Sequence, residues 1–189
     1  MKTAILLFSS LLFACGSSAD STPASTKGAP TAPEASAPRG PRFATPEGWI
    51  EEAPENRMRA KQYSLPGAEG SEPALAVVAY WPGGIGGVEV NLDRWVSQVG
   101  SDRSAAELSG EERWVTETNG YLATHVHVEG QIKPMEGMGK DIVSTEAGAI
   151  LAAYIEPDGT NDVWTVKVTG PSATVQAHKE RYAAFVAGL

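Results

Sequence analysis

The sequence predicts an α+β fold in which a mainly antiparallel sheet is covered by helices on both faces. Residues 74–81 and 148–155 are apolar at nearly every position. A sheet with one face in water would alternate polar and apolar residues there, so both faces of the sheet centre are expected to be covered. Two helix-like segments, 88–99 and 172–187, are available to cover them. Strands followed by a helix, more strands and a final helix favour the α+β class.

The strands are delimited by turn residues. We expect strands at residues 57–65, 74–81, 114–118, 121–128, 148–155 and 163–169, after a short segment that begins at Trp49. Asn119-Gly120 tolerates positive φ at both central turn positions, which predicts a hairpin between the third and fourth of these strands. Pro157-Asp158-Gly159 predicts the turn that leads into the last one.

Both helices are predicted from apolar spacing and from their ends. In residues 88–99, Val88, Leu92, Trp95, Val96 and Val99 recur at helical spacing. The second helix follows Gly170-Pro171, which breaks a strand, and Ser172, which can cap a helix. Its apolar stripe consists of Val175, Tyr182, Phe185, Val186 and Leu189.

The N-terminus carries a targeting signal. Residues 1–14 combine a lysine with a short apolar run, which is typical of a secretory signal peptide and too short for a transmembrane helix. The chain has one cysteine, Cys15, so no intrachain disulfide can form. The junction Leu12-Phe13-Ala14-Cys15 resembles the lipobox of bacterial lipoproteins. The alternative is an ordinary signal peptide with a chance cysteine.

The lipobox resemblance implies that the peptide is cut before Cys15 and that this cysteine is acylated. Several acyl chains would then hold the protein on a lipid membrane, because each buried methylene contributes about 0.8 kcal/mol. Gly16 stands where an aspartate would retain a lipoprotein at the inner membrane. The resemblance therefore implies an outer-membrane anchor with the folded part in the periplasm.

Residues 15–41 are expected to be a disordered tether, and residues 42–189 a single domain. The tether is rich in Ser, Pro and Ala and has no large apolar side chain, so nothing in it offsets the entropy of ordering. The formal net charge of the chain is -8. An acidic chain of this kind is a poor partner for nucleic acid, which needs a basic surface.

Four short motifs in residues 42–189, followed by the closing amphipathic helix, carry a family resemblance. They are Pro46-Glu47-Gly48-Trp49, Met58-Arg59, Gly86-Gly87 with Asn91-x-x-Arg94-Trp95-x-x-Gln98, and Trp164-x-x-Lys167-x-Thr169-Gly170-Pro171. The chain resembles a group of uncharacterised bacterial envelope lipoproteins and, more distantly, proteins of the PsbP-like fold. That resemblance implies an α/β/α sandwich. It implies no activity, because function does not follow from fold.

The glycine-rich stretch 83–87 raises the question of a phosphate site. A phosphate loop needs a lysine at its end, and no lysine or arginine lies between Lys61 and Arg94. Glu89 would also place a carboxylate against the phosphates. We therefore interpret the stretch as a bend between a strand and a helix, where glycines permit positive φ.

Asn91, Arg94 and Gln98 are the candidate ligand-binding residues. Their spacing of i, i+3 and i+7 places them on one side of the first helix, beside Trp95, where they could hold a ligand carboxylate or a partner loop. The alternative is a solvated helix face with Arg94 packing or pairing locally.

His125, His127 and Glu129 are the candidate metal ligands. Residues two apart on a strand share a face, and zinc or copper takes such ligands. Met135 and Met138 lie in the connection that follows. The alternative is a polar strand face, with Leu122, Val126 and Val128 turned inward.

No catalytic signature is present in the sequence: it contains neither Gly-x-Ser-x-Gly nor His-Glu-x-x-His. The leading hypothesis is a non-enzymatic binding or accessory module without a cofactor, acting on an envelope protein or a small molecule. Its expected contact surface is the long connection 131–147 together with residues 83–87. The alternatives are a zinc- or copper-binding envelope protein that uses His125 and His127, and an enzyme of unidentified class.

Overall fold

The computed structural model describes residues 40–132 and 147–189. The expected signal peptide, Cys15, nearly all of the tether and most of the connection 131–147 lie outside the described residues. Gly40–Leu189 form one compact unit, which is called the folded unit below. Within the described residues, no helix has the length and apolar character needed to span a bilayer.

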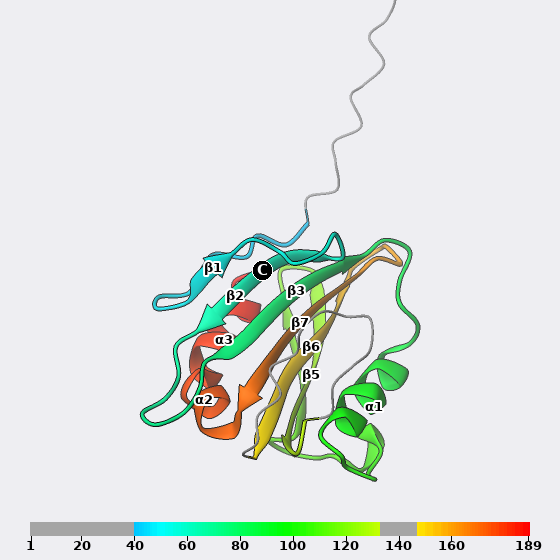
Figure 1. The fold of residues 1–189 in the computed structure, drawn as a ribbon. Coiled ribbons are helices and arrows are strands. Elements are labelled where there is room, and N and C mark those ends of the chain that lie inside the picture. Colours follow the sequence, from blue (N-terminus) through cyan, green and yellow to red (C-terminus); the bar gives the residue numbers. More distant parts are fainter. Residues whose placement is uncertain (1–39, 133–146) are drawn as a thin grey trace, which may run out of the picture. The chain divides into compact units, whose positions relative to one another are not determined.

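Seven strands of the described residues form one antiparallel sheet in the order β1-β2-β3-β7-β6-β5-β4 (Figure 1). The predicted α+β class and its mainly antiparallel sheet are confirmed. The strands are β1 (Ile50–Glu52), β2 (Arg59–Leu65), β3 (Ala74–Trp81), β4 (Arg113–Thr118), β5 (Tyr121–Gly130), β6 (Gly148–Pro157) and β7 (Val163–Pro171). The helices are α1 (Val88–Gln98), α2 (Ser172–Ala177) and α3 (Lys179–Ala187), with a short 3-10 helix, η1 (Ala105–Glu107).

The continuous apolar runs of the sequence are the inner strands of the sheet. Strand β6 is buried at every position from Gly148 to Ile155. Strand β3 pairs with β7 from Leu75 opposite Thr169 to Trp81 opposite Val163. These inner strands have neighbours on both sides, so their backbone groups are satisfied by the ladders and their side chains supply much of the core.

Alternate residues of β6 belong to two separate hydrophobic clusters. Leu151 and Ala153 lie in one cluster, while Ile150 and Ala152 lie in the other. The first cluster includes Val175, Tyr182, Phe185 and Val186 of α2 and α3. The second includes Leu92, Trp95 and Val96 of α1. Helix α1, green in Figure 1, contacts β5 and β6, whereas α2, in orange to red, contacts β6 and β7, and α3, in red, contacts β4.

The final helix is divided at His178, where a single helix was predicted. The backbone there has φ -103° and ψ 2°, outside the ordinary helical range. The His178 amide donates to the carbonyls of both Thr174 and Val175, which tightens the last turn of α2. At this break the His178 ring lies in the core, where it contacts Trp49.

Burial is unexpected at two further positions. The charged neighbours of His178 in the sequence, Lys179 and Glu180, favour an exposed side chain, but His178 is 7% exposed and bonds to Trp49 and Pro66. Leu122 was expected to turn inward, but it is 40% exposed, whereas Val126 and Val128 are buried as predicted. Leu122 lies opposite Glu117 near the turn of the β4–β5 hairpin, beyond the reach of either cluster.

Candidate functional site

The glycine-rich bend holds α1 in place through Asn91. Gly84 and Gly86 adopt φ of 95° and 90°, which few other residues tolerate. The Asn91 side-chain amide donates to the carbonyls of Ile85 and Gly87, at 3.2 and 3.0 Å. Both N–H groups of the Asn91 amide are used in these bonds, and its oxygen, Oδ1, is left to accept a hydrogen bond. The predicted bend between a strand and a helix is confirmed, and it has a second role in positioning Asn91.

Arg94 is positioned by that oxygen. Its Nη2 donates to Asn91 Oδ1 at 2.8 Å. Its Nε is buried and has no hydrogen-bond partner among the described residues. Burial lowers the pKa of the Arg94 guanidinium, which nevertheless stays charged at neutral pH. Arg94 also has no carboxylate partner in the described part of the chain.

Gln98 lies one turn further along α1. It is 6% exposed, and its Oε1 accepts from Lys167 Nζ of β7 at 3.4 Å. Its Nε2 is buried without a partner in the described ranges. Asn91, at 1% exposure, is buried as well. The alternative of a solvated helix face is therefore wrong for both residues, because α1 turns this side toward the sheet.

These side chains line a pocket between α1 and the sheet. Arg94, Trp95 and Gln98 form one wall, and the other walls come from the segment before β2 and from β2, β3 and β7. The further lining residues are Asn56, Met58, Arg59, Val77, Ala79, Trp81, Thr165 and Lys167. The cavity volume is about 50 Å³. A few water molecules or one small terminal group would fill it, since a water needs at least about 10–15 Å³ by this measure.

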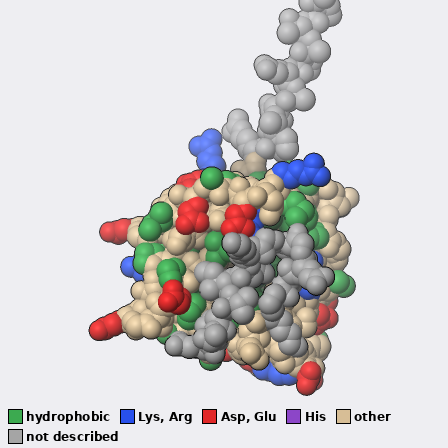
Figure 2. All heavy atoms as spheres, in the orientation of Figure 1, with side chains coloured by type: hydrophobic (Ala, Val, Ile, Leu, Met, Phe, Trp, Pro, Cys, Tyr) green, Lys and Arg blue, Asp and Glu red, His purple; other side chains and the backbone are tan. Residues whose placement is uncertain are grey.

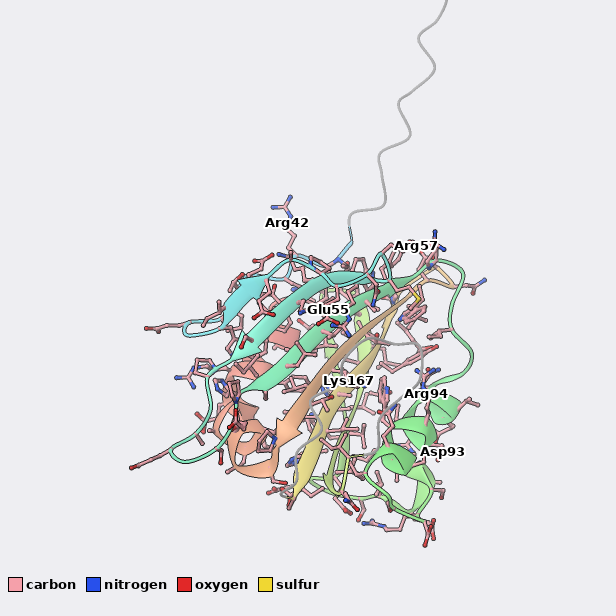
Figure 3. The ribbon with its side chains drawn as sticks, in the orientation of Figure 1. Arg42, Glu55, Arg57, Asp93, Arg94 and Lys167 are labelled. Carbon is pink, nitrogen blue, oxygen red and sulfur yellow. The ribbon has the colours of Figure 1, made fainter. Side chains whose placement is uncertain are left out.

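The pocket is basic although the chain is acidic. Figure 2 shows acidic side chains scattered over the face in view. In the pocket, Arg59 donates to Gln62 at 2.6 Å and pairs with Glu55 at 3.4 Å. Figure 3 shows Arg94 on α1 and Lys167 on β7 within the fold, and Arg42 pointing away from it. The polar side chains that line the pocket are thus mainly cations and N–H donors.

The structure brings three of the predicted site residues, Arg94, Trp95 and Gln98, together in the lining of the pocket. The fourth, Asn91, does not line the pocket but bonds to Arg94. Sequence reasoning missed Arg59, Trp81 and Lys167 as pocket residues. Lys167 carried a usable signal, because a lysine in the middle of an apolar strand needs a polar environment on one face of the sheet. Glu89, expected beside the glycines, instead pairs with Arg113 of β4, and this pairing lowers the pKa of its carboxyl.

The two histidines of β5 have different environments. His125 is 2% exposed, and its ring stacks on Trp114 with 4.7 Å between centroids. Its Nε2 lies 2.8 Å from Thr116 Oγ1 and its Nδ1 lies 3.1 Å from Tyr182 Oη. Both nitrogens are therefore engaged, and burial lowers the pKa of His125 to about 4.

His127 lies on the same face but nearer the surface. Its Nε2 is buried without a hydrogen-bond partner in the described residues, and it lies 3.9 Å from a carboxylate oxygen of Glu129. Within residues 40–132 and 147–189, no three His, Cys, Asp or Glu side chains are arranged to hold a metal ion. Met135 and Met138 lie outside the described residues.

Comparison with known proteins gives little further information. No protein-family model and no curated protein matches the chain. One similar solved structure is the crystal structure of a protein of unknown function from Pseudomonas aeruginosa, described as a candidate regulator. It has a TM-score of 0.45 and 14% identity, and the match covers 75% of this chain and 95% of that one. This likeness assigns neither a function nor a site residue.

Proposed function

We propose that this chain is a lipoprotein anchored to the outer membrane through acylated Cys15, and that its folded unit is a non-enzymatic binding module in the periplasm. The pocket between α1 and strands β2, β3 and β7 is its binding site. One observation supports the site above all. Arg94 Nε and Gln98 Nε2 are buried donors without partners in the described residues. An unmet buried donor costs about 1–3 kcal/mol, so a ligand that accepts from both would gain affinity.

The architecture that we propose for the folded unit is the α/β/α sandwich of the PsbP-like fold, which the sequence resembles distantly. The division of β6 side chains between a cluster with α1 residues and a cluster with α2 and α3 residues supports it.

The binding site is tested with a panel of small neutral, cationic and anionic aromatic compounds. The chain has five tryptophans, each with an indole N–H that gives a separate nitrogen-15 NMR signal. We expect binding compounds to shift the signals of Trp81 and Trp95, which line the pocket, and to leave Trp49 unchanged. If no compound of any charge moves Trp81 or Trp95, the site is refuted.

The anchor is tested by incorporation of labelled palmitate and by fractionation. The wild-type chain should take up the label, and Cys15→Ser should not. A second variant, in which an ordinary cleavable signal peptide followed by serine replaces residues 1–15, should be found in the soluble periplasm. Tight membrane association of this second variant would refute anchoring by Cys15.

The metal-binding alternative now depends on His127, because both nitrogens of His125 are engaged. The unpartnered Nε2 of His127 is the observation that favours it. Equilibrium dialysis with zinc and with copper(I) tests it. Absence of binding at micromolar metal would remove this alternative.

A further inference from the structure

We propose that the pocket binds a monocarboxylate attached to a small, flat apolar group. The inference rests on the binding site proposed above and names the chemical class of its ligand. Three features of the described pocket carry it: the unmet hydrogen-bond donors, the unbalanced charge of Arg94 and the apolar side chains that line the rest of the pocket.

The unmet polar groups on α1 are both donors. An ammonium can only donate, so the contact from Lys167 Nζ identifies the Gln98 atom facing it as the oxygen. The Gln98 NH₂ group is then the buried, unpartnered end. Arg94 Nε–H is the second donor, and residues four apart on a helix are neighbours on its surface. The two oxygens of a carboxylate can accept from both, whereas an ammonium or another cation would face donors only.

The charge of Arg94 favours an anionic ligand. Arg59 has Glu55 as a counter-charge, but Arg94 has no carboxylate partner within the described residues. Removing an unpaired guanidinium from water is costly, and one bound negative charge would offset that cost. A dianion would bring a second negative charge into a small, partly apolar cavity. A carboxylate therefore fits better than a doubly charged phosphate.

The apolar wall determines the rest of the ligand. Trp95 is 3% exposed and Ala79 is 6% exposed, and the half-buried Val77 and Trp81 lie beside them. Trp81 is held by its indole N–H, which donates to Thr165 Oγ1 at 3.1 Å. Flat apolar groups pack well on such rings. The cavity volume of about 50 Å³ limits the enclosed part of the ligand to the carboxylate and a few adjoining atoms.

The experiment is isothermal titration calorimetry on the full chain in a non-ionic detergent. The probes are phenylacetate, its neutral analogue phenylacetamide, N-acetylphenylalanine, N-acetylphenylalaninamide and inorganic phosphate. We expect each carboxylate to bind about tenfold more tightly than its amide, since charge-assisted hydrogen bonds are about twice as strong as neutral ones. Tighter binding of phenylacetate indicates a free acid as the ligand. Tighter binding of N-acetylphenylalanine indicates a peptide C-terminus.

The variants assign the preference to the pocket. Arg94→Met should reduce the ratio of carboxylate to amide affinity to about one, and Gln98→Met should weaken carboxylate binding severalfold. Arg42→Met is the matched control, because it removes the same charge from an exposed side chain that points away from the fold. It should leave the ratio unchanged. If Arg94→Met does not fold, Arg94→Gln replaces it, with circular dichroism as the check.

The inference is overturned if amides bind as tightly as carboxylates, if Arg94→Met keeps the preference, or if phosphate binds and no carboxylate does. In each of these cases the proposed binding site still stands. The site itself fails only when the tryptophan signals respond to no compound in the aromatic panel, so the two failures are distinguishable.

Discussion

Single buried side chains set how the stability of this protein depends on pH, and His125 is the clearest case. Its pKa is lowered to about 4 because the ring is buried between Trp114, Thr116 and Tyr182. Above pH 6.5 the imidazole is neutral in both the folded and the unfolded state. Between pH 6.5 and about 4 the unfolded state binds a proton that the folded state does not, so stability falls as the pH falls.

We expect this effect to remove about 2–3 kcal/mol from the free energy of unfolding between pH 7 and pH 4.5. Urea denaturation of the wild type and of His125→Gln at both pH values measures it. The variant should be less stable at pH 7, because it loses the stacking on Trp114. It should then lose less stability on acidification than the wild type. An equal loss in both proteins would contradict the assignment.

The second buried histidine joins the start of the folded unit to its last helices. Trp49 Nε1 donates to His178 Nδ1 at 3.1 Å, so the proton of the neutral ring lies on Nε2, which donates to the Pro66 carbonyl at 3.0 Å. We expect Trp49→Phe to cost about 1–3 kcal/mol, because it leaves a buried acceptor without a donor.

A double-mutant cycle with His178→Phe isolates the Trp49–His178 contact from the loss of volume. The expected coupling free energy, from urea denaturation of the four proteins, is at least about 0.5 kcal/mol. Strictly additive losses would show that the hydrogen bond contributes nothing.

At the level of the elements, the bend between β3 and α1 depends on backbone conformation. Gly86 has φ 90° and Gly87 has φ -69°, and a methyl group added at either position would meet no atom closer than 4.0 Å. Gly86→Ala should therefore destabilise the protein by about 1–2 kcal/mol through strain alone. Gly87→Ala is the matched control, and its cost in urea denaturation should be smaller, because alanine readily adopts the extended conformation of Gly87. Equal costs would show that φ is not the cause.

The sequence was informative about elements wherever a local pattern decided the outcome. The apolar run of β6, the Asn119-Gly120 turn and the helical spacing of α1 each predicted the observed element within a few residues. The division between α2 and α3 could not be predicted, because it depends on the contacts of His178 with Trp49 and Pro66, which are distant in sequence.

Only part of the pocket could be predicted from the sequence, because some of its residues come together through long-range contacts. Arg94 and Gln98 share a helix face, so their spacing was enough to group them. Lys167 is 69 residues from Gln98, and its approach depends on β7 lying beside β3 in the sheet. Strand order is a property of long-range pairing, which local periodicity does not report.

At the scale of the whole molecule, the aromatic residues that precede the sheet belong to the core. Phe43 packs against Trp164 and Phe185, and Trp49 packs against Tyr63 and Phe185. We expect a fragment of residues 40–189 to be as stable as residues 16–189. A fragment of residues 50–189 should lose more than about 5 kcal/mol, because two large buried side chains are missing. Urea denaturation of the three chains checks this expectation, and an equally stable shortest fragment would contradict it.

The pairing of β3 with β7 also governs when the sheet can be completed. A chain that emerges with its N-terminus first, from a ribosome or through a membrane channel, presents residues 74–81 long before residues 163–171. Strand β7 lies between β3 and β6, so the early half of the sheet, β1 to β3, and the later half, β4 to β6, have no common edge until it arrives. The long segment between β3 and β7 makes their pairing slow to form. An apolar strand that lacks its neighbour is prone to aggregation. We therefore expect this chain to be most prone to aggregation in the interval before residues 163–189 emerge.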